Sequence, residues 1–185
     1  MPPVADLNVA VLARHRYQEL ELWFPLLRYR EVGAATSLIG RAAVEHLGGV
    51  GYPAIPDQIA GESPVPAVLI VPGRGPAAGG AGNHGAGADD DDQLTTAERD
   101  LLHAVRDAGG VVAAIGDGVD VLGAAGLLAG RTVAASEASA GRLAGFGASR
   151  ADGTVHTDQA IVTAASADDL PAFVTAIDAA ALPST

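Results

Sequence analysis

The sequence predicts an α/β protein in which helices cover both faces of a mainly parallel sheet, giving a three-layer sandwich. Short runs of valine, isoleucine and leucine alternate along the chain with amphipathic stretches of helical length. The runs are apolar at successive positions, not at every second one, which is typical of strands buried on both faces. Strands of that kind need helices on either side of the sheet.

Each predicted element follows from this alternation. Predicted strands in chain order are Leu7–Ala13, Ala35–Ile39, Val68–Val71, Val111–Ile115, Thr132–Ala135 and Ala160–Thr163. Predicted helices are Gln18–Arg30, Thr95–Ala108, Val119–Leu128 and Ala167–Ala181. Thr95 and Glu98 have the spacing of a capping box, and Ser166 precedes two aspartates at the start of the last helix. The order of strands and helices is flavodoxin-like.

Length and composition narrow the functional classes. A chain of 185 residues suits one domain, 1–185. A formal net charge of −11 would repel a phosphate backbone, so we expect no nucleic acid partner. No apolar run approaches the roughly 18 residues that span a bilayer, so we expect no membrane partner. The first residues lack the features of a secretory signal, which favours a cytoplasmic protein.

Two residue types are missing altogether. The sequence has no cysteine, which excludes disulfides, thiolate catalysis and zinc–thiolate sites. All 11 basic residues are arginine, so a Schiff-base lysine is excluded as well. The glycine-rich segment after Val71 lacks the full pattern of a phosphate or dinucleotide loop. The sequence therefore implies no cofactor.

The apolar run Val111–Ile115 stops at Gly116-Asp117-Gly118, and a helical pattern follows at once. A buried parallel strand that leads directly into a helix places this turn at the carboxyl edge of the sheet. Open α/β folds bind their ligands at that edge. We therefore expect the functional site at the Gly116–Gly118 turn.

The same stretch carries a family resemblance. Residues 111–131 read VVAAIGDGVDVLGAAGLLAGR, which resembles the ThiJ/PfpI family segment Ala-Ile-Cys-His-Gly that continues to Gly-Leu-Leu-x-Gly-Arg. Residues 7–25 are similar to the first strand and helix of that family, and residues 67–73 to the strand that ends in Pro-Gly-Gly. The family belongs to the class I glutamine amidotransferase-like superfamily, and the resemblance extends from Leu7 to about Ala180.

The resemblance implies positions for the site residues, several of them altered here. Gly116 occupies the position of the family's nucleophilic cysteine, and Asp117 that of a histidine. Glu21 matches the acidic residue that contacts the cysteine. Arg74 replaces the second glycine of the Pro-Gly-Gly turn, whose backbone amides help to form an anion pocket. Ser136 falls where many members carry a further histidine.

Glu21 and Asp117 are the candidate catalytic residues. Two carboxylates in one partly buried pocket cannot both ionise cheaply, so one pKa rises and an acid and a base can coexist near neutral pH. Each residue also has a structural interpretation. Asp117 suits the N-cap of the following helix, and Glu21 suits an exposed helix surface. Ser136 lacks a nearby base in sequence and is a poor replacement nucleophile.

Five further residues are candidates for substrate binding. Gly116 would open space above the helix N-terminus, or would only relieve backbone strain in the turn. Arg74 would clamp a carboxylate or phenolate, or be solvated. His15 follows the first strand and would shuttle protons, or lie on a surface loop. Gly73 and Gly118 complete the set.

The segment 75–93 is rich in glycine and aspartate, which indicates a flexible surface loop and a candidate lid. His84 and the run Asp89–Asp92 lie in it, but adjacent aspartates on a flexible loop lack a fixed coordination geometry, so we expect no metal.

The leading hypothesis, which the resemblance implies, is an enzyme of the ThiJ/PfpI type that works without a thiol, by carboxylate acid/base catalysis on a small organic molecule as its substrate. It would act as a lyase or isomerase, because hydration, dehydration, isomerisation and cyclisation need proton transfer but no nucleophilic side chain. The alternative is a non-catalytic member that binds a small ligand or a partner protein. A homodimer is expected, since the first helix carries more apolar residues than one buried face needs. These residues are Leu20, Leu22, Trp23, Phe24 and Leu27.

Overall fold

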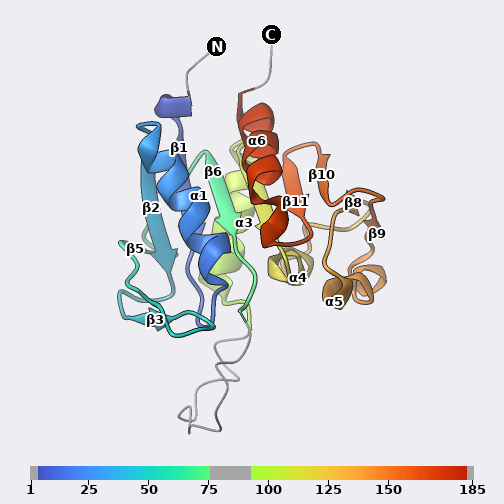
Figure 1. Ribbon diagram of the computed structural model, residues 1–185, viewed down its shortest axis with the longest axis horizontal. Helices are drawn as coiled ribbons and strands as arrows, with labels where there is room; N and C mark the ends of the chain where they lie inside the picture. The colour runs from blue at the N-terminus through green and yellow to red at the C-terminus, as the bar shows by residue number, and fades with distance from the viewer. Residues whose placement is uncertain (1–3, 76–92, 183–185) are drawn as a thin grey trace, which may run out of the picture.

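The computed structural model describes residues 4–75 and 93–182, and the core of this part is a seven-stranded sheet between two layers of helices (Figure 1). The strand order is β10-β11-β7-β6-β1-β2-β5. Every neighbouring pair is parallel except β10 with β11. The predicted α/β class, mainly parallel sheet and layers are confirmed.

The strands of the main sheet are β1 (Asn8–Leu12), β2 (Ala35–Gly40), β5 (Gln58–Ile59), β6 (Val68–Val71), β7 (Val111–Ile115), β10 (Val155–Asp158) and β11 (Ile161–Ala164). Two small separate sheets are formed by β3 (His46–Leu47) with β4 (Pro53–Ala54), and by β8 (Thr132–Val133) with β9 (Ser149–Arg150). The α-helices are α1 (Glu19–Glu31), α3 (Thr96–Asp107), α4 (Gly118–Ala124), α5 (Glu137–Ala140) and α6 (Leu170–Ala181). Short 3₁₀ helices are η1 (Val4–Asp6), η2 (Leu143–Phe146) and η3 (Ala167–Asp169).

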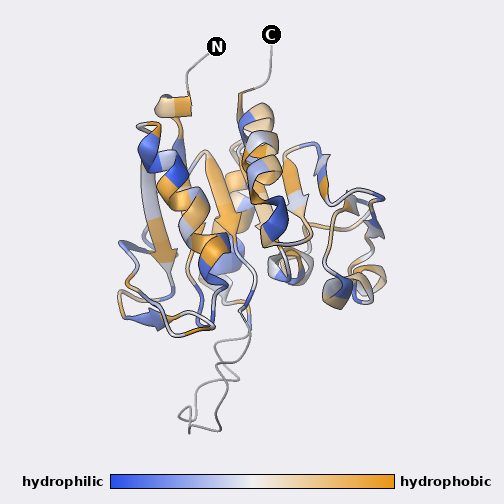
Figure 2. Ribbon diagram, in the orientation of Figure 1, coloured by the Kyte–Doolittle hydropathy of each residue, from blue (hydrophilic) through white to orange (hydrophobic). Residues whose placement is uncertain are grey.

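The central strands bury both faces. In β1, Val9 and Val11 belong to the core beneath α1 and α6, while Ala10 and Leu12 belong to the core beneath α3 and α4. All five residues of β7 are buried in the same alternating way. Figure 2 shows the central strand β6 as one of the most hydrophobic ribbons. This double burial explains why the strands are apolar at successive positions.

Several boundaries and pairings differ from the sequence prediction. The helix predicted at Val119–Leu128 ends at Ala124, because Gly126 adopts the left-handed φ of +79° that stops a helix. The strand predicted at Thr132–Ala135 covers only Thr132–Val133 and pairs with β9 outside the main sheet. Strand β10 was not predicted, because its Val155–Asp158 sequence is mostly polar and only partly buried at the sheet edge.

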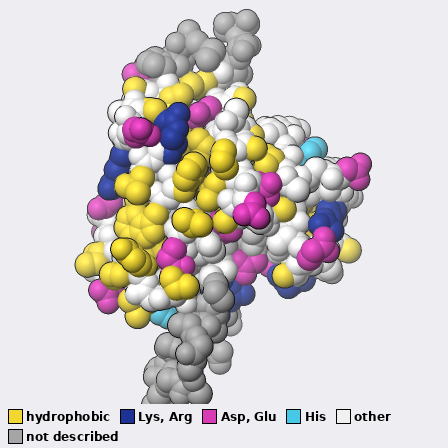
Figure 3. Space-filling model, in the orientation of Figure 1, with side chains coloured by type: hydrophobic (Ala, Val, Ile, Leu, Met, Phe, Trp, Pro, Cys, Tyr) yellow, Lys and Arg dark blue, Asp and Glu magenta, His cyan; other side chains and the backbone are white. Residues whose placement is uncertain are grey.

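Helix α1 has an apolar face that remains uncovered. Leu22 is fully buried and Trp23 packs partly against the core. In contrast, Leu20 and Leu27 expose 60% and 54% of their surface, and Phe24 exposes 38%. Figure 3 shows apolar side chains gathered on the face of the molecule that carries α1. None of the helices in the described part of the chain has the length and apolar character needed to cross a bilayer.

Candidate functional site

Three turns meet at the carboxyl edge of the sheet. Strand β1 lies between β2 and β6, so the chain changes direction across the sheet between β1 and β6. Such a switch point is where open α/β sheets bind ligands. The turns after β1 and β6 are joined by the backbone, since the amide of Gln18 donates to the carbonyl of Gly73 at 2.8 Å. The turn after β7 lies beside them because β7 pairs with β6.

Glu21 enters this edge from the first turn of α1. Gln18 caps the helix by accepting a hydrogen bond from the Glu21 amide, which fixes the position of Glu21. The Glu21 residue is only 5% exposed, and its Oε2 accepts a hydrogen bond from the Gly73 amide at 2.8 Å. A Cβ atom added at Gly116 would lie 3.0 Å from Oε1. Glu21 therefore lies beside the turn after β7, and the interpretation as an exposed helix residue is wrong.

The environment of Glu21 disfavours its charge. Burial raises the pKa of Glu21 from 4.5 to about 7; the Gly73 amide opposes the shift and the nearby charge of Asp117 adds to it. Near neutral pH the group exists in both protonation states. The expected rise in one pKa of the pair is thus present at Glu21, with burial and not charge repulsion as its main cause.

Asp117 occupies the N-cap position of α4 but makes no capping hydrogen bond with its side chain. Its Oδ1 accepts instead from the backbone amide of Arg74, and its Oδ2 lies 3.4 Å from the Arg74 Nε. The interpretation of Asp117 as a simple helix cap is therefore wrong. Its carboxylate joins the turn after β7 to the turn after β6.

Gly73 lies between the two carboxylates. A Cβ atom added there would lie 2.5 Å from Oδ1 of Asp117 and 2.9 Å from Oε2 of Glu21. Only glycine fits this close approach. The amides of Gly73 and Arg74 both donate to these carboxylates, so the anion pocket implied by the resemblance is occupied by the chain's own side chains.

The other two glycines of the turn have mainly structural roles. Gly116 has a φ of +61°, a conformation that strains any residue with a side chain, and its missing Cβ leaves the Glu21 carboxyl group in place. A Cβ atom at Gly118 would lie 2.3 Å from the carbonyl oxygen of Val71, so glycine is needed for α4 to approach β6. Neither residue lines the cavity described next.

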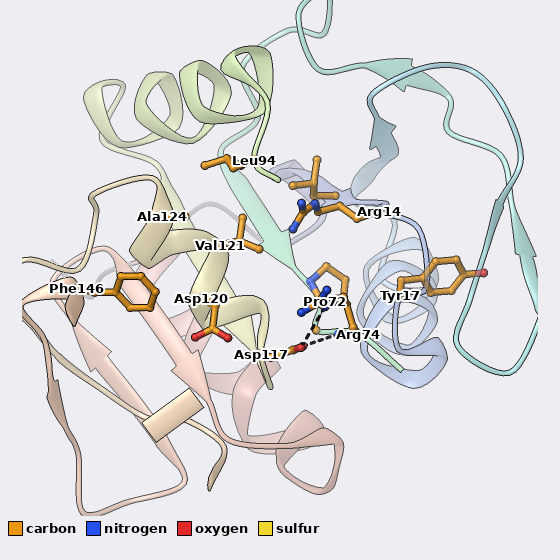
Figure 4. A pocket seen from close by; sticks show the side chains of 12 residues that line it. Arg14, Tyr17, Pro72, Arg74, Leu94, Asp117, Asp120, Val121, Ala124 and Phe146 are labelled. Atoms are coloured by element: carbon orange, nitrogen blue, oxygen red, sulfur yellow. Dashed lines mark hydrogen bonds and ion pairs between the residues drawn. The ribbon is translucent and has the colours of Figure 1, made fainter. Parts of the chain in front are cut away.

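A cavity of about 240 Å³ opens at this edge (Figure 4). Its lining comprises Leu12, Arg14, Tyr17, Pro72, Gly73, Arg74, Leu94, Asp117, Asp120, Val121, Ala124 and Phe146. Figure 4 shows Asp117 beside Arg74, with Asp120 and Phe146 on one side of the cavity and Arg14 on the other. Among the predicted site residues, Gly73, Arg74 and Asp117 line it. Glu21 and His15 do not.

Two charged groups at the cavity were not singled out from the sequence. Arg14 lies 3.4 Å from Oε1 of Glu98, which also contacts Arg41 at 3.3 Å. Asp120, in the first turn of α4, pairs with Arg142 and accepts a hydrogen bond from Ser139. The argument that selected His15, its position after β1, applies equally to its neighbour Arg14. Asp120 was detectable as an acid two residues after Gly118, the residue at which α4 begins.

The remaining candidates are assigned as follows. Ser136 caps α5, and its hydroxyl oxygen accepts a hydrogen bond from the Ser139 amide at 3.2 Å. Across residues 4–75 and 93–182, no group of three or more histidines, cysteines, aspartates or glutamates could hold a metal ion. Most of the segment 75–93, with His84 and Asp89–Asp92, lies outside the described residues, so its predicted roles as a flexible loop and lid remain predictions.

Comparison with known proteins agrees with the fold. The profile of the DJ-1/PfpI family matches residues 7–180. A two-domain protein from Anabaena variabilis, with DJ-1/ThiJ/PfpI-like and ferritin-like domains, is similar at a TM-score of 0.82 and 21% identity. The match covers 94% of this chain but 48% of that protein. No curated protein matches the sequence.

Two further solved structures have the same fold. A ThiJ/PfpI family protein from Pseudomonas syringae has a TM-score of 0.75 and 23% identity, over 94% of this chain and 68% of that one. DJ-1beta of Drosophila melanogaster has a TM-score of 0.76 and 19% identity, over 94% and 89% of the two chains. At these identities the likeness concerns the fold alone.

Proposed function

The chain belongs to the DJ-1/PfpI family, and from this premise we propose that it is an enzyme that transfers protons with Glu21 and Asp117 and forms no thiol intermediate. The chain has no cysteine, so any catalysis here must use other groups. Hydration, dehydration, isomerisation or cyclisation of a small organic molecule fits two carboxyl groups without a nucleophile. The observation that carries the proposal is the Glu21 carboxyl group, buried beside Asp117 with a pKa of about 7.

The two carboxyl groups have different positions and therefore different proposed roles. Asp117 lines the cavity and is the group that contacts the substrate, as the general base. Glu21 lies behind Gly73 and is the proton donor. Since Gly73 has no side chain, a water molecule or a small shift of the carboxyl group suffices to connect Glu21 with the cavity. The proton that Asp117 removes from one substrate atom is replaced at another atom by the proton from Glu21.

The alternative is a non-catalytic member that binds a small ligand or a partner protein. Two observations favour it: Glu21 does not line the cavity, and the amides of Gly73 and Arg74 already donate to side chains. If this alternative is correct, a screen of small metabolites would identify a ligand that the protein binds but does not convert.

An assay separates the two functions. Small metabolites are screened for thermal stabilisation, because a ligand that binds only the folded state raises the Tm, and each hit is tested for conversion. Glu21→Gln and Asp117→Asn should each lower turnover about a hundredfold or more, the usual contribution of a positioned proton-transfer group. Glu31→Gln, at the exposed end of the same helix, is the control. Unchanged turnover in both site variants would exclude the proposed mechanism.

We also propose a homodimer through α1. Leu20, Phe24 and Leu27 follow one another at spacings of four and three residues, which places them on one exposed face of the helix. Leu20→Glu combined with Leu27→Glu should give a monomer in sedimentation experiments at micromolar concentration. Val65→Glu, an exposed apolar position away from α1, should leave the dimer intact. A wild-type protein that sediments only at the monomer mass of 18.4 kDa would refute the dimer.

A further inference from the structure

Asp120, in the first turn of α4, uses only one of its two carboxylate oxygens. Its Oδ2 accepts hydrogen bonds from the Ser139 hydroxyl at 3.2 Å and from the Arg142 Nε at 3.0 Å. Its Oδ1 is buried, and among the residues that the structure describes it has no hydrogen-bond partner. A buried carboxylate oxygen without a donor costs free energy, and such atoms are rare in native proteins. Oδ1 is therefore a candidate acceptor for a ligand.

Asp120 lines the cavity at the carboxyl edge of the sheet. Figure 4 shows it between Asp117 and Phe146, on the same helix as Val121. Its side chain is 20% exposed while Oδ1 is buried, so this oxygen lies behind the accessible part of the residue. The torsion that rotates an aspartate carboxyl group is broad. A modest rotation therefore brings Oδ1 to the cavity, and the half-exposed Arg142 is free to follow Oδ2.

The contacts of Oδ2 decide which kind of ligand suits Oδ1. The Arg142 guanidinium group already compensates the charge of the Asp120 carboxylate, so Oδ1 needs a hydrogen-bond donor and not a second cation. A carboxylate ligand has no donor to offer and carries the same charge as Asp117 and Asp120. A neutral N–H or O–H group meets the need, and hydrogen bonds to a charged acceptor are stronger than those between neutral groups.

We propose that Asp120 is a substrate-binding residue, and that the cavity takes a small neutral molecule whose N–H or O–H group donates to Oδ1. The apolar part of the molecule packs against Leu12, Val121 and Phe146. The volume of about 240 Å³ is below the roughly 300–1,000 Å³ of sites for drug-sized ligands, so the ligand is small. This inference rests on the proposed function, since it names the substrate class of the site in which Asp117 is the base.

Three small rings test the ligand class without any turnover. Pyrrole, furan and pyrrolidinium are five-membered rings of nearly the same size; pyrrole has an N–H donor, furan has none, and pyrrolidinium is a cation. In NMR titrations of the whole chain, pyrrole should bind at least about tenfold more tightly than furan and shift the amide signals of Val121 and Phe146. Equal binding of pyrrole and furan, or shifts only outside the cavity, would overturn the proposal. Tighter binding of pyrrolidinium than of pyrrole would overturn it too, and would assign the site to cations.

Asp120→Asn distinguishes a binding role from a structural one. Because Arg142 has only donors, the asparagine carbonyl oxygen should take the place of Oδ2, and the asparagine NH₂ group that of Oδ1. A donor then faces the donor of the ligand. Pyrrole should therefore bind about tenfold or more weakly than to the wild type, while furan binding should change by less than about twofold. A purely structural role predicts that both rings lose affinity by the same factor, and that result would overturn the proposal.

Ser139→Ala is the matched control, because it removes one contact of Oδ2 and leaves Oδ1 unchanged. The ratio of pyrrole affinity to furan affinity should stay at the wild-type value. A fall of this ratio to the value in Asp120→Asn would overturn the proposal. Folding of each variant is checked by its urea unfolding curve. If a variant does not fold, the comparison of the three rings on the wild type still decides.

Failure of this inference and failure of the proposed function are distinguishable. A preference for pyrrole that depends on Asp120, combined with no converted substrate, supports the donor-binding site and excludes only the catalysis. Turnover that depends on Glu21 and Asp117, combined with no preference for pyrrole, excludes only the binding role of Asp120.

Discussion

Two buried glutamates each contact a residue that lines the cavity, Glu98 through Arg14 and Glu21 through Gly73, and they have very different partners. Glu98, in the first turn of α3, is 0% exposed and contacts two arginines and the Thr95 cap. Glu21, in the first turn of α1, is 5% exposed; its contacts are one backbone amide and, as a neighbour, another carboxylate. Each of these glutamates lies near the start of a helix that the sequence predicted.

The difference shows that burial alone does not identify a functional acid. The charge of a buried carboxylate with cationic partners and a cap is compensated where it lies, so removing that carboxylate destabilises the fold. A buried carboxylate that lacks cationic partners keeps its proton to a higher pH, which is the property a proton-transfer group needs. Glu98, which contacts Arg14, is a carboxylate of the first kind, and Glu21, which contacts Gly73, is one of the second kind.

The largest expected effect is on stability at Glu98. Glu98→Ala leaves Arg14 and Arg41 without their shared carboxylate and removes half of the capping box, so it should lower the free energy of unfolding by about 3–5 kcal/mol. Urea unfolding measures the loss. Glu31→Ala, at an exposed position, should change it by less than about 0.5 kcal/mol. If the two variants were equally stable, the structural role assigned to Glu98 would be lost.

The second prediction concerns the pH dependence of stability at Glu21. The folded-state pKa of about 7 lies above the ordinary value of 4.5, so the folded protein holds this proton more tightly than the unfolded chain. The stabilisation that this group contributes must therefore fall as the pH rises from about 4.5 to 7, and stay reduced above 7. The shift corresponds to roughly 3 kcal/mol, at about 1.4 kcal/mol per pKa unit.

Glu21→Gln should remove this dependence, because a glutamine has no proton to lose. Urea unfolding of the wild type and the variant at intervals between pH 4.5 and 8 measures the difference between them, in which the titration of all other groups largely cancels. The variant should gain stability relative to the wild type as the pH rises. Parallel pH profiles would show that the pKa of Glu21 is not raised.

The contacts of these two glutamates could be predicted from the sequence only in part. The capping box at Thr95 and Glu98 was predicted because both of its partners lie within one helical turn. The arginine partners of Glu98 were not predicted. Arg41, for example, is 57 positions away from Glu98 in the chain, and only the fold brings the two residues together. The position of Glu21 beside the turn after β7 was expected from the family resemblance and is seen in the structure.

Side-chain direction limited the rest of the site prediction. Arg14 and His15 both follow β1, which ends at Leu12, so the alternation of side-chain direction along a strand no longer applies to them. The sequence alone therefore does not tell which of the two side chains lines the cavity. The amides of Gly73 and Arg74 were expected to serve a ligand. They donate to Glu21 and Asp117 instead, which depends on the spacing of three turns that no local pattern encodes.

The smallest expected effect is at Gly116, where two substitutions separate backbone strain from contact with Glu21. Gly116 and Gly109 have left-handed φ angles of +61° and +77°. A Cβ atom at Gly109 meets nothing within 4 Å, whereas one at Gly116 lies 3.0 Å from the Glu21 carboxyl group. Gly109→Ala should therefore cost about 1 kcal/mol from strain alone, and Gly116→Ala about 2 kcal/mol.

The contact with Glu21 gives Gly116→Ala a second signature. An apolar methyl group against the carboxyl group excludes water from it, and this should raise the pKa of Glu21 further. In the unfolding experiments the pH-dependent loss of stability should then extend to a higher pH in Gly116→Ala, while Gly109→Ala keeps the wild-type profile. Identical profiles in the two alanine variants would mean that the Glu21 carboxyl group does not lie against Gly116, and that its burial has another cause.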